Sequence, residues 1–291
     1  MATVTIGTTA TARPSSDRSF IWARRNKTII GGTLILLALL GVAILAPWLA
    51  GDPLQFEPIN RLKRPSEEFW FGTDQFGRDV YSRVIYGTRI SLVVGFSVAV
   101  LATVVGLVLG VVCGYYRRVD AIVMRIMDGM MAIPAILLAI ALITLMKASL
   151  MIVIIAISIP EIPRVVRLVR SVVLSVRARP YIEAAIASGT RNTKIMVRHI
   201  LPNTVAPLVV QATYVCASAI LTEAGLSFLG AGTPPEIPSW GNVISLGRTF
   251  FQIAPWIIFF PGIMLAITVL AVNLVGDGLR DTLDPRIARR M

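Results

Sequence analysis

The chain has 291 residues, of which 55% are hydrophobic and only 15% are charged, whereas soluble domains carry about 25% charged residues. This apolar surplus excludes an ordinary soluble domain and requires lipid as the solvent. The formal net charge is +12, but the basic residues lie between long apolar runs, which indicates membrane sidedness and not nucleic-acid binding. The composition therefore predicts an all-α polytopic membrane protein that contacts lipid and binds no nucleic acid.

The N-terminal region divides into a polar tail and a first apolar run. Residues 1–23 are rich in Thr, Ala and Ser, which predicts a disordered tail. The run 28–49 follows basic residues. It is too long for the hydrophobic region of a signal peptide, and no clear cleavage site follows it. About 20 apolar residues cross the hydrocarbon, so we expect an uncleaved first span.

A polar loop, residues 51–89, follows this span and ends in a glycine-rich stretch. Gly72 and Gly77 allow tight turns. Asp74 and Arg78 are spaced i,i+4, as are Asp79 and Arg83, so each pair would form an ion pair if the segment were helical. Two interpretations stay open: a self-satisfied surface turn, or a loop that takes part in gating or partner contact.

The next three apolar runs predict spans over 90–116, 121–145 and 150–170. In the first of them Gly106, Gly110 and Gly114 recur every fourth residue, a spacing that lets another helix approach closely.

Charged residues and prolines mark the two runs that follow. Asp128 is expected to pair with Arg125 near the membrane interface. Pro160 and Pro163 are expected to break the fourth span. Glu161 between them is expected to pair with an arginine three or six residues later, because buried charges are usually paired.

A short polar island, residues 180–203, separates the fourth and fifth spans. Pro180 suits a helix start, and Gly189 suits the left-handed residue that ends a helix. A second short helix is expected from Asn192 to Ile200, ended by Pro202. The island therefore predicts a helix–turn–helix.

The remaining apolar runs predict a fifth span over 204–226 and a sixth over 255–275. Glu223 lies near the outer end of the fifth span, where a gate or pathway role competes with a helix-end contact. A second polar loop carrying Trp240 joins these spans, and residues 287–291 form a C-terminal tail.

The distribution of basic residues predicts which ends are inside. With the N-terminus inside, 20 of the 28 Lys and Arg residues fall on inner segments and 8 on outer segments, whereas the acidic residues divide evenly. This asymmetry obeys the positive-inside rule. It places both termini and the 180–203 island in the cytoplasm.

No motif in the sequence predicts catalysis. None of the four lysines follows a glycine, so the chain has no Gly-Lys-Ser/Thr phosphate loop. His199 is the single histidine, and Cys113 and Cys216 both lie inside apolar runs. We therefore expect no enzyme activity, no metal site and no cofactor in this chain.

Four stretches resemble the permease subunits of ABC importers of the dipeptide, oligopeptide and nickel branch. They are Trp70–Gly87, Glu183–Pro202, Ile220–Gly230 and Asn273–Pro285. The resemblance implies a type I importer permease fold with six transmembrane helices, formed by a single domain over 24–286, in a bacterial inner membrane. It implies a companion permease in a heterodimer, two ATPase subunits that bind ATP and Mg, and an extracytoplasmic binding protein that delivers a small peptide-like solute.

The resemblance also implies roles for particular residues. ATPase coupling falls on the 180–203 island, at Glu183, Ala184, Ala185, Gly189, Leu201 and Pro202. A periplasmic gate or binding-protein contact falls on Gly72, Asp74, Gly77, Arg78, Asp79, Glu223 and Trp240.

Two other functional classes stay open on the sequence. An ion-coupled secondary transporter would need coupling groups near the membrane midplane and often shows inverted repeats, and neither is visible here. A structural or assembly subunit would not need a helix–turn–helix on the cytoplasmic side.

The charge asymmetry generates a topology prediction. In a cysteine-free background, cysteines at Ser66 and Ser188 are expected to react with a membrane-impermeant reagent from opposite sides. Labelling of intact cells and of inverted vesicles measures this. Labelling of both positions from outside would contradict the six-span arrangement.

Overall fold

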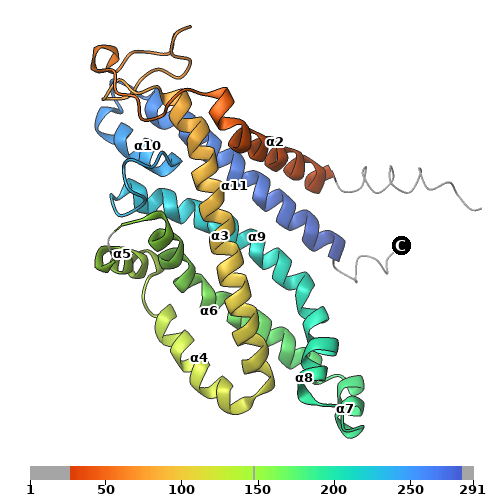
Figure 1. Ribbon diagram of the computed structural model, residues 1–291. Coiled ribbons are helices and arrows are strands. Elements are labelled where there is room, and N and C mark those ends of the chain that lie inside the picture. The colour runs from red at the N-terminus through yellow and green to blue at the C-terminus, as the bar shows by residue number, and fades with distance from the viewer. Residues whose placement is uncertain (1–26, 147, 284–291) are drawn as a thin grey trace, which may run out of the picture.

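The computed structural model describes residues 27–146 and 148–283, which form helices and connecting loops without a β-strand in those ranges (Figure 1). The long helices are α2 (Lys27–Leu49), α3 (Val80–Tyr115), α6 (Leu150–Arg177), α9 (Leu201–Phe228) and α11 (Trp256–Leu283). The shorter ones are η1 (Pro58–Asn60), α4 (Arg117–Met131), α5 (Ala135–Leu145), α7 (Pro180–Ala187), α8 (Asn192–Ile195), η2 (Met196–Ile200), α10 (Trp240–Gly247) and η3 (Arg248–Phe250).

Helix α3 is the central element of the bundle. It packs against α6 and α9, and also contacts α2, α10 and α11. Its 36 residues correspond to about 54 Å at the rise of an α-helix. The loop before α3 and helix α10 lie at one end of the molecule, and α7 and α8 lie at the other (Figure 1). We call these the outer end and the α7–α8 end.

The seam between α3 and α6 is formed by glycines against valines. A Cβ added at Gly106 would lie 2.5 Å from the Cβ of Val165, and one at Gly110 would lie 2.6 Å from that of Val169. Gly114 meets Val173 in the same way. The predicted close approach of another helix is therefore confirmed, with α6 as the partner.

Among residues 27–146 and 148–283, four helical segments are long and apolar enough to cross a membrane: α2, α3, the continuous segment 192–228, and α11. A fifth is obtained if α4 and α5, which meet at an angle of 90°, are taken as one bent span. The predicted six-span arrangement additionally needs α6, whose 28 residues include Glu161 and several arginines.

The predicted break in the fourth span is wrong. Helix α6 continues through Pro160 and Pro163 without interruption. Each proline removes one backbone hydrogen bond, but Val153, Ala156 and Val165 on either side are buried against the bundle. This packing holds the helix together. The break occurs instead in the third apolar run, between α4 and α5, where Pro134 precedes the second helix.

The predicted helix end at Pro202 is also wrong, because the chain is helical from Asn192 to Phe228. A proline ring clashes with the carbonyl four residues earlier. Here η2 is a π-helical turn in which the backbone N–H of Leu201 donates to the carbonyl of Met196, five residues back. This wider turn leads directly into α9 and accommodates Pro202 in its first turn.

Two boundary regions of the predicted organisation lie outside the described residues. These are the tails 1–23 and 287–291, together with the adjoining ends of the predicted domain, 24–26 and 284–286. The described start of α2 and end of α11 lie side by side, since a Cβ at Gly278 would meet Ile29 at 2.6 Å.

The glycine seam generates a stability prediction. In Gly110→Ala the new methyl group would overlap Val169, and such overpacking costs about 1–3 kcal/mol. The purified protein should unfold at a lower temperature than the wild type.

Gly41→Ala is the matched control, because a Cβ at Gly41 has no neighbour within 4 Å. That variant should unfold no earlier than the wild type, since Ala favours a helix over Gly. Equal unfolding temperatures for wild type and Gly110→Ala would contradict the tight seam.

Candidate functional site

The α7–α8 end forms the helix–turn–helix that the sequence predicts. Pro180 occupies the first turn of α7 and Glu183 is the acidic residue of that turn. Gly189 has φ = +75° and follows α7 at the turn, so its predicted left-handed conformation is confirmed. The backbone N–H groups of Gly189 and Thr190 donate to the carbonyls of Ile186 and Ala185 at 2.9 and 3.1 Å, which closes the end of the helix.

One face of this hairpin is buried and the other is exposed. Ile182, Ile195 and Ile200 are fully buried and belong to the same apolar cluster as Val173 and Val176 of α6. Of the six residues expected to couple to an ATPase, Glu183, Ala184, Gly189 and Pro202 are exposed, whereas Ala185 and Leu201 are half-buried. The hairpin is thus fixed to the bundle by its buried face and presents small side chains on its exposed face.

Polar contacts around Tyr115 join this hairpin to the ends of two long helices. The Tyr115 hydroxyl donates to Oδ1 of Asn192 at 2.7 Å, which links the end of α3 to the start of α8. Arg177 donates from Nη1 to the Tyr115 carbonyl at 2.7 Å, and its guanidinium lies 5.1 Å from the ring centroid. The start of α8 is therefore bonded directly to the end of α3, and the end of α3 is bonded in turn to α6.

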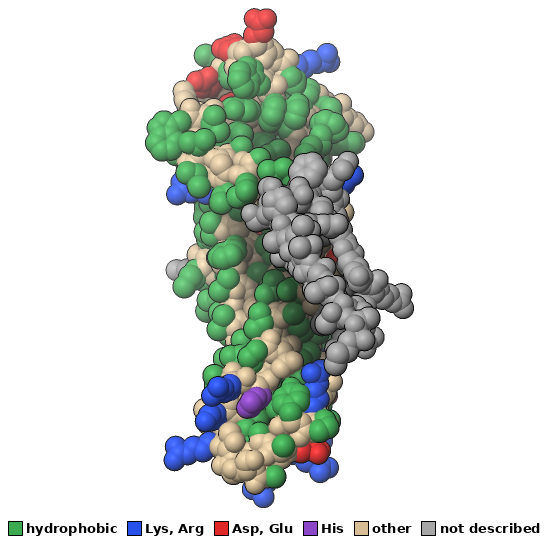
Figure 2. All heavy atoms as spheres, turned by 90° about the vertical axis from the view of Figure 1, so that its right-hand side faces the viewer, with side chains coloured by type: hydrophobic (Ala, Val, Ile, Leu, Met, Phe, Trp, Pro, Cys, Tyr) green, Lys and Arg blue, Asp and Glu red, His purple; other side chains and the backbone are tan. Residues whose placement is uncertain are grey.

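Basic side chains gather on one face of the same end of the molecule. Figure 2 shows Lys and Arg gathered at the lower end of the visible face, with hydrophobic side chains over much of the length above them. His199, the single histidine, is half-buried and its ring lies 6.3 Å from that of Tyr181.

Ion pairs connect α4 to α6. Asp128 pairs with Arg167, so its predicted pairing with Arg125 is wrong. Asp120 pairs with Arg170 in the same way. Both partners come from α6 because the fold places that helix alongside α4, which the local sequence spacing does not reveal. Glu161 pairs with Arg164 at 3.0 Å, as expected.

At the outer end, Asp74 organises a tight turn. Its Oδ1 accepts from the backbone N–H of Phe76 at 2.8 Å and of Arg78 at 3.0 Å, and its Oδ2 accepts from Nε of Arg78 at 2.7 Å. Gly77 has φ = +75°, and a Cβ there would collide with the carbonyl oxygen of Glu57. The predicted Asp74–Arg78 pair is confirmed, although it lies in a turn and not in a helix.

The predicted pair Asp79–Arg83 does not form. Asp79 instead caps α3, accepting from the backbone N–H of Tyr81 and Ser82 at 3.2 and 3.0 Å. Arg83 is fully buried and its Nη1 lies 3.7 Å from Oδ2 of Asp74. A carboxylate before the first turn of a helix satisfies the free N–H groups there, which explains why Asp79 faces the backbone.

Glu223 lies at the centre of a buried polar network at the outer end of α9. Its Oε1 accepts hydroxyl donors from Ser227 at 2.8 Å, Ser239 at 2.8 Å and Thr233 at 3.3 Å. Ser239 also caps α10 by accepting from the backbone N–H of Asn242. The network therefore fixes the loop before α10 onto the end of α9.

Trp240 joins this network to α3. It is fully buried, and its indole N–H donates to the carbonyl of Val84 at 3.0 Å. The residues expected to act as an outer gate or partner contact thus come together at one end, but all of them are buried except Asp79, which is half-buried. The side chains that the turn exposes are Gln75, which is half-buried, and Phe76. A direct contact of the buried set with a partner stays a prediction.

Several features that shape both ends have no signal in the local sequence pattern. Tyr115 and Asn192 are 77 residues apart, and Leu62, with φ = +53°, is the non-glycine residue in the left-handed region within the described ranges. Within those ranges there is also no group of three or more His, Cys, Asp or Glu side chains that could hold a metal ion.

Comparison with known proteins places the chain among transport proteins. Residues 106–289 match the family described as "Binding-protein-dependent transport system inner membrane component". The chain is 56% identical over 268 residues to "Probable peptide ABC transporter permease protein y4tQ" of Sinorhizobium fredii, covering 92% of each chain. It is 46% identical over 271 residues to "Dipeptide transport system permease protein DppC" of Alkalihalophilus pseudofirmus, covering 92% of this chain and 89% of the relative.

The fold is similar to that of a solved transporter chain. The inward-facing MetNI methionine ABC transporter aligns with a TM-score of 0.56 and 21% identity, covering 69% of this chain and 96% of that one. The likeness supports the predicted type I importer permease fold.

The Glu223 network generates a second stability prediction. Glu223→Ala removes the acceptor of three buried hydroxyl groups, and each unsatisfied buried donor costs about 1–3 kcal/mol. Hydrogen exchange should accelerate over residues 233–243. Glu223→Gln keeps a carbonyl acceptor and should show a smaller change.

Glu236→Ala is the matched control, because Glu236 is an exposed carboxylate in the same loop. Its exchange rates should equal those of the wild type. Unchanged exchange in Glu223→Ala would show that the network does not hold α10 in place.

Proposed function

The chain belongs to the family of binding-protein-dependent transport system inner membrane components, and we propose that it forms half of the translocation pathway of an ATP-driven importer. The same matches support this class over an ion-coupled secondary transporter or a purely structural subunit. ATP hydrolysis belongs to separate subunits, and this chain supplies the membrane passage and the means of moving it.

The proposed assembly contains a companion permease, two ATPase subunits that bind ATP and Mg, and an extracytoplasmic binding protein. The protein is placed in the bacterial inner membrane with both termini in the cytoplasm. Two observations support this orientation: the basic residues are concentrated on the predicted inner segments, and the start of α2 lies beside the end of α11.

The solute is proposed to be a small peptide-like molecule. Support comes from the relatives described above, whose names refer to peptide and dipeptide transport. Since a binding protein delivers the solute, selection among peptides is assigned mainly to that protein.

The α7–α8 hairpin is the observation that carries the proposal. It exposes Glu183, Ala184 and Gly189 at one end of the molecule, where small side chains allow close approach of a partner groove. Its other face is fixed to α3 through the Tyr115–Asn192 hydrogen bond and packs with α6 through the buried isoleucines. A hairpin that contacts only solvent would not need attachment to both α3 and α6.

In the proposed mechanism the hairpin acts as a rigid lever. Closure of the ATPase pair displaces α7 and α8. The Tyr115–Asn192 hydrogen bond and the apolar contacts of Ile182 pass this displacement to the ends of α3 and α6. Because the glycine seam holds these two helices together along their length, they tilt as one body and change access to the pathway.

Gly189 provides the test of this function. No neighbour lies within 4 Å of a Cβ at Gly189, so a side chain there meets only backbone strain, about 1–2 kcal/mol for the left-handed region. We expect Gly189→Val to insert and assemble with the companion permease. It should lose the ATPase subunits, or keep them without stimulation of ATP hydrolysis by the loaded binding protein.

Gly189→Asn is the matched control, because Asn adopts positive φ more readily than a β-branched residue. It should retain most of the stimulation. Co-purification and stimulated ATPase activity in reconstituted membranes measure both variants. Wild-type stimulation and uptake in Gly189→Val would overturn the proposed coupling role.

A further inference from the structure

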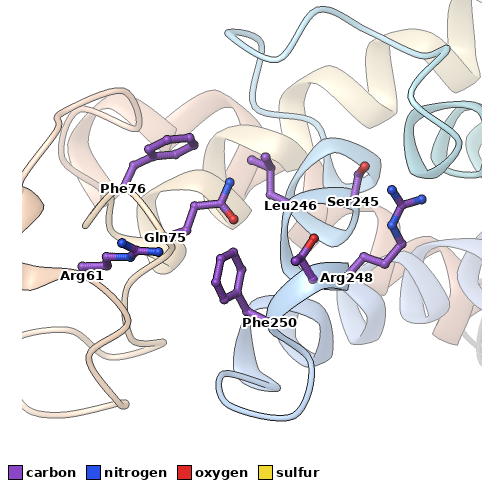
Figure 3. Close-up of a pocket in the computed structure, with 8 residues that line it drawn as sticks. Arg61, Gln75, Phe76, Ser245, Leu246, Arg248 and Phe250 are labelled. Carbon is purple, nitrogen blue, oxygen red and sulfur yellow. The ribbon is translucent and has the colours of Figure 1, made fainter.

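An open hollow of about 570 Å³ lies at the outer end of the molecule (Figure 3). We call it the outer hollow. One wall comes from the loop before α3 and the other from the end of α10 and from η3. Its lining residues are Arg61, Gln75, Phe76, Ser245, Leu246, Arg248, Thr249 and Phe250.

The first wall is built by the Asp74 turn. Gln75 and Phe76 lie at its tip, between the buried Asp74 and Gly77. The backbone around Arg61 is held by the same region, because Asn60 accepts from the Thr73 hydroxyl and Leu62 donates to the Asp74 carbonyl at 3.1 Å. The buried charges of this end therefore serve as a scaffold that presents other side chains to the hollow.

Leu62 adds a conformational constraint on Arg61. Its backbone adopts φ = +53°, which is unfavourable for a bulky residue. Its side chain packs against the outer apolar cluster that contains Trp240 and Ile257. Because Leu62 packs inward, the preceding residue, Arg61, is directed outward. The backbone strain at Leu62 is of a kind that is often found at binding sites.

The second wall is anchored by the Glu223 network. Ser239, bound to Glu223, caps α10, and α10 ends just before Arg248, Thr249 and Phe250. Arg248 donates to the carbonyl of Phe228 at 3.3 Å, and its guanidinium lies 5.4 Å from the ring of that residue. Both walls are therefore attached to separate buried carboxylates.

The hollow itself is basic and lacks a compensating anion. Its lining includes two arginines, three neutral polar side chains and no Asp or Glu. Neither Arg61 nor Arg248 forms an ion pair within residues 27–146 and 148–283. Arg61 lies 5.8 Å from the centroid of the Phe250 ring, a position that leaves donors of its planar guanidinium free for a carboxylate.

We propose that the outer hollow receives an acidic side chain of the extracytoplasmic binding protein when that protein docks. The proposal rests on the proposed function and adds the contact that the docking uses. Arg61 is the group placed to pair with the carboxylate, because the guanidinium of Arg248 lies on the far side of the hollow from it, directed away from Arg61 (Figure 3). Arg248 adds positive charge at the rim, and amide and hydroxyl donors from Gln75, Ser245 and Thr249 line the space between.

The binding protein is favoured over other sources of a carboxylate by the position and shape of the hollow. It lies at the end opposite the α7–α8 hairpin (Figure 1), where a partner outside the membrane reaches it. It is open and is bordered by the exposed Phe76 and the half-buried Phe250, and aromatic residues and Arg are enriched at protein–protein interfaces.

The test uses the complete reconstituted transporter and the binding protein that stimulates its wild-type ATPase activity. The affinity of that binding protein for the transporter is measured with and without bound peptide, at two salt concentrations. Arg61→Gln and Arg248→Gln should each weaken docking by about three- to fivefold, and the double variant by about tenfold. The double variant should also show a weaker salt dependence.

Arg64→Gln is the matched control, since it removes the same charge from an exposed residue of the same loop outside the hollow. It should change affinity less than twofold. A decisive result is rescue: an Asp or Glu to Arg change in the binding protein should restore docking to Arg61→Glu.

Three results would overturn the proposal. The first is wild-type affinity in the double variant. The second is unchanged docking of the binding protein to the double variant, together with uptake that no longer distinguishes peptides with a free C-terminal carboxylate from amidated peptides. That result would assign the hollow to the solute. The third is loss of the companion permease when the double variant is purified, which would show that the hollow is a contact between the two permease subunits. Failure of the proposed function itself gives a different result, because the wild-type complex would then show no stimulation by any binding protein.

Discussion

The close contact between α3 and α6 is the constraint on which the other parts of the structure depend. Gly106, Gly110 and Gly114 leave room for the valines of α6, so the two helices approach closely from residue 106 to residue 114. Helix α3 begins at the capped turn of the outer end and ends at Tyr115, beside the α7–α8 hairpin. Since close packing resists gradual deformation, the displacement of the hairpin that we propose would reach the outer end as a rigid-body movement.

Both ends of the molecule separate scaffold from contact surface by burial. Asp74 is 1% exposed and Glu223 is fully buried, and each satisfies backbone or hydroxyl donors of its own loop. The exposed groups are of another kind: small residues on the hairpin, and arginines beside aromatic rings around the outer hollow. Because an unpaired charge is costly when buried but inexpensive in water, the groups left free for partners are found at the surface.

Much of the architecture and part of the site follow from local sequence patterns. Long apolar runs predict the helices, because their backbone must satisfy itself in lipid. Glycine at every fourth position predicts the seam, and Gly189 after a short helix predicts the turn, because each depends on the absence of a side chain at one position. The Asp74–Arg78 pair is predictable because its partners are only four residues apart.

Contacts between distant segments were decided by the tertiary structure alone. Local rules predicted breaks at Pro160 and Pro202, yet packing of the flanking residues and a π-helical turn keep both segments helical. Spacing suggested Arg125 for Asp128, but α6 supplies Arg167. The Tyr115–Asn192 bond and the outer hollow join segments far apart in the chain. The sequence by itself determined which segments are apolar helices and where the chain turns at Gly189, because those features depend on neighbouring residues. Helix continuity at the prolines and pairing between segments depend on how the whole chain packs.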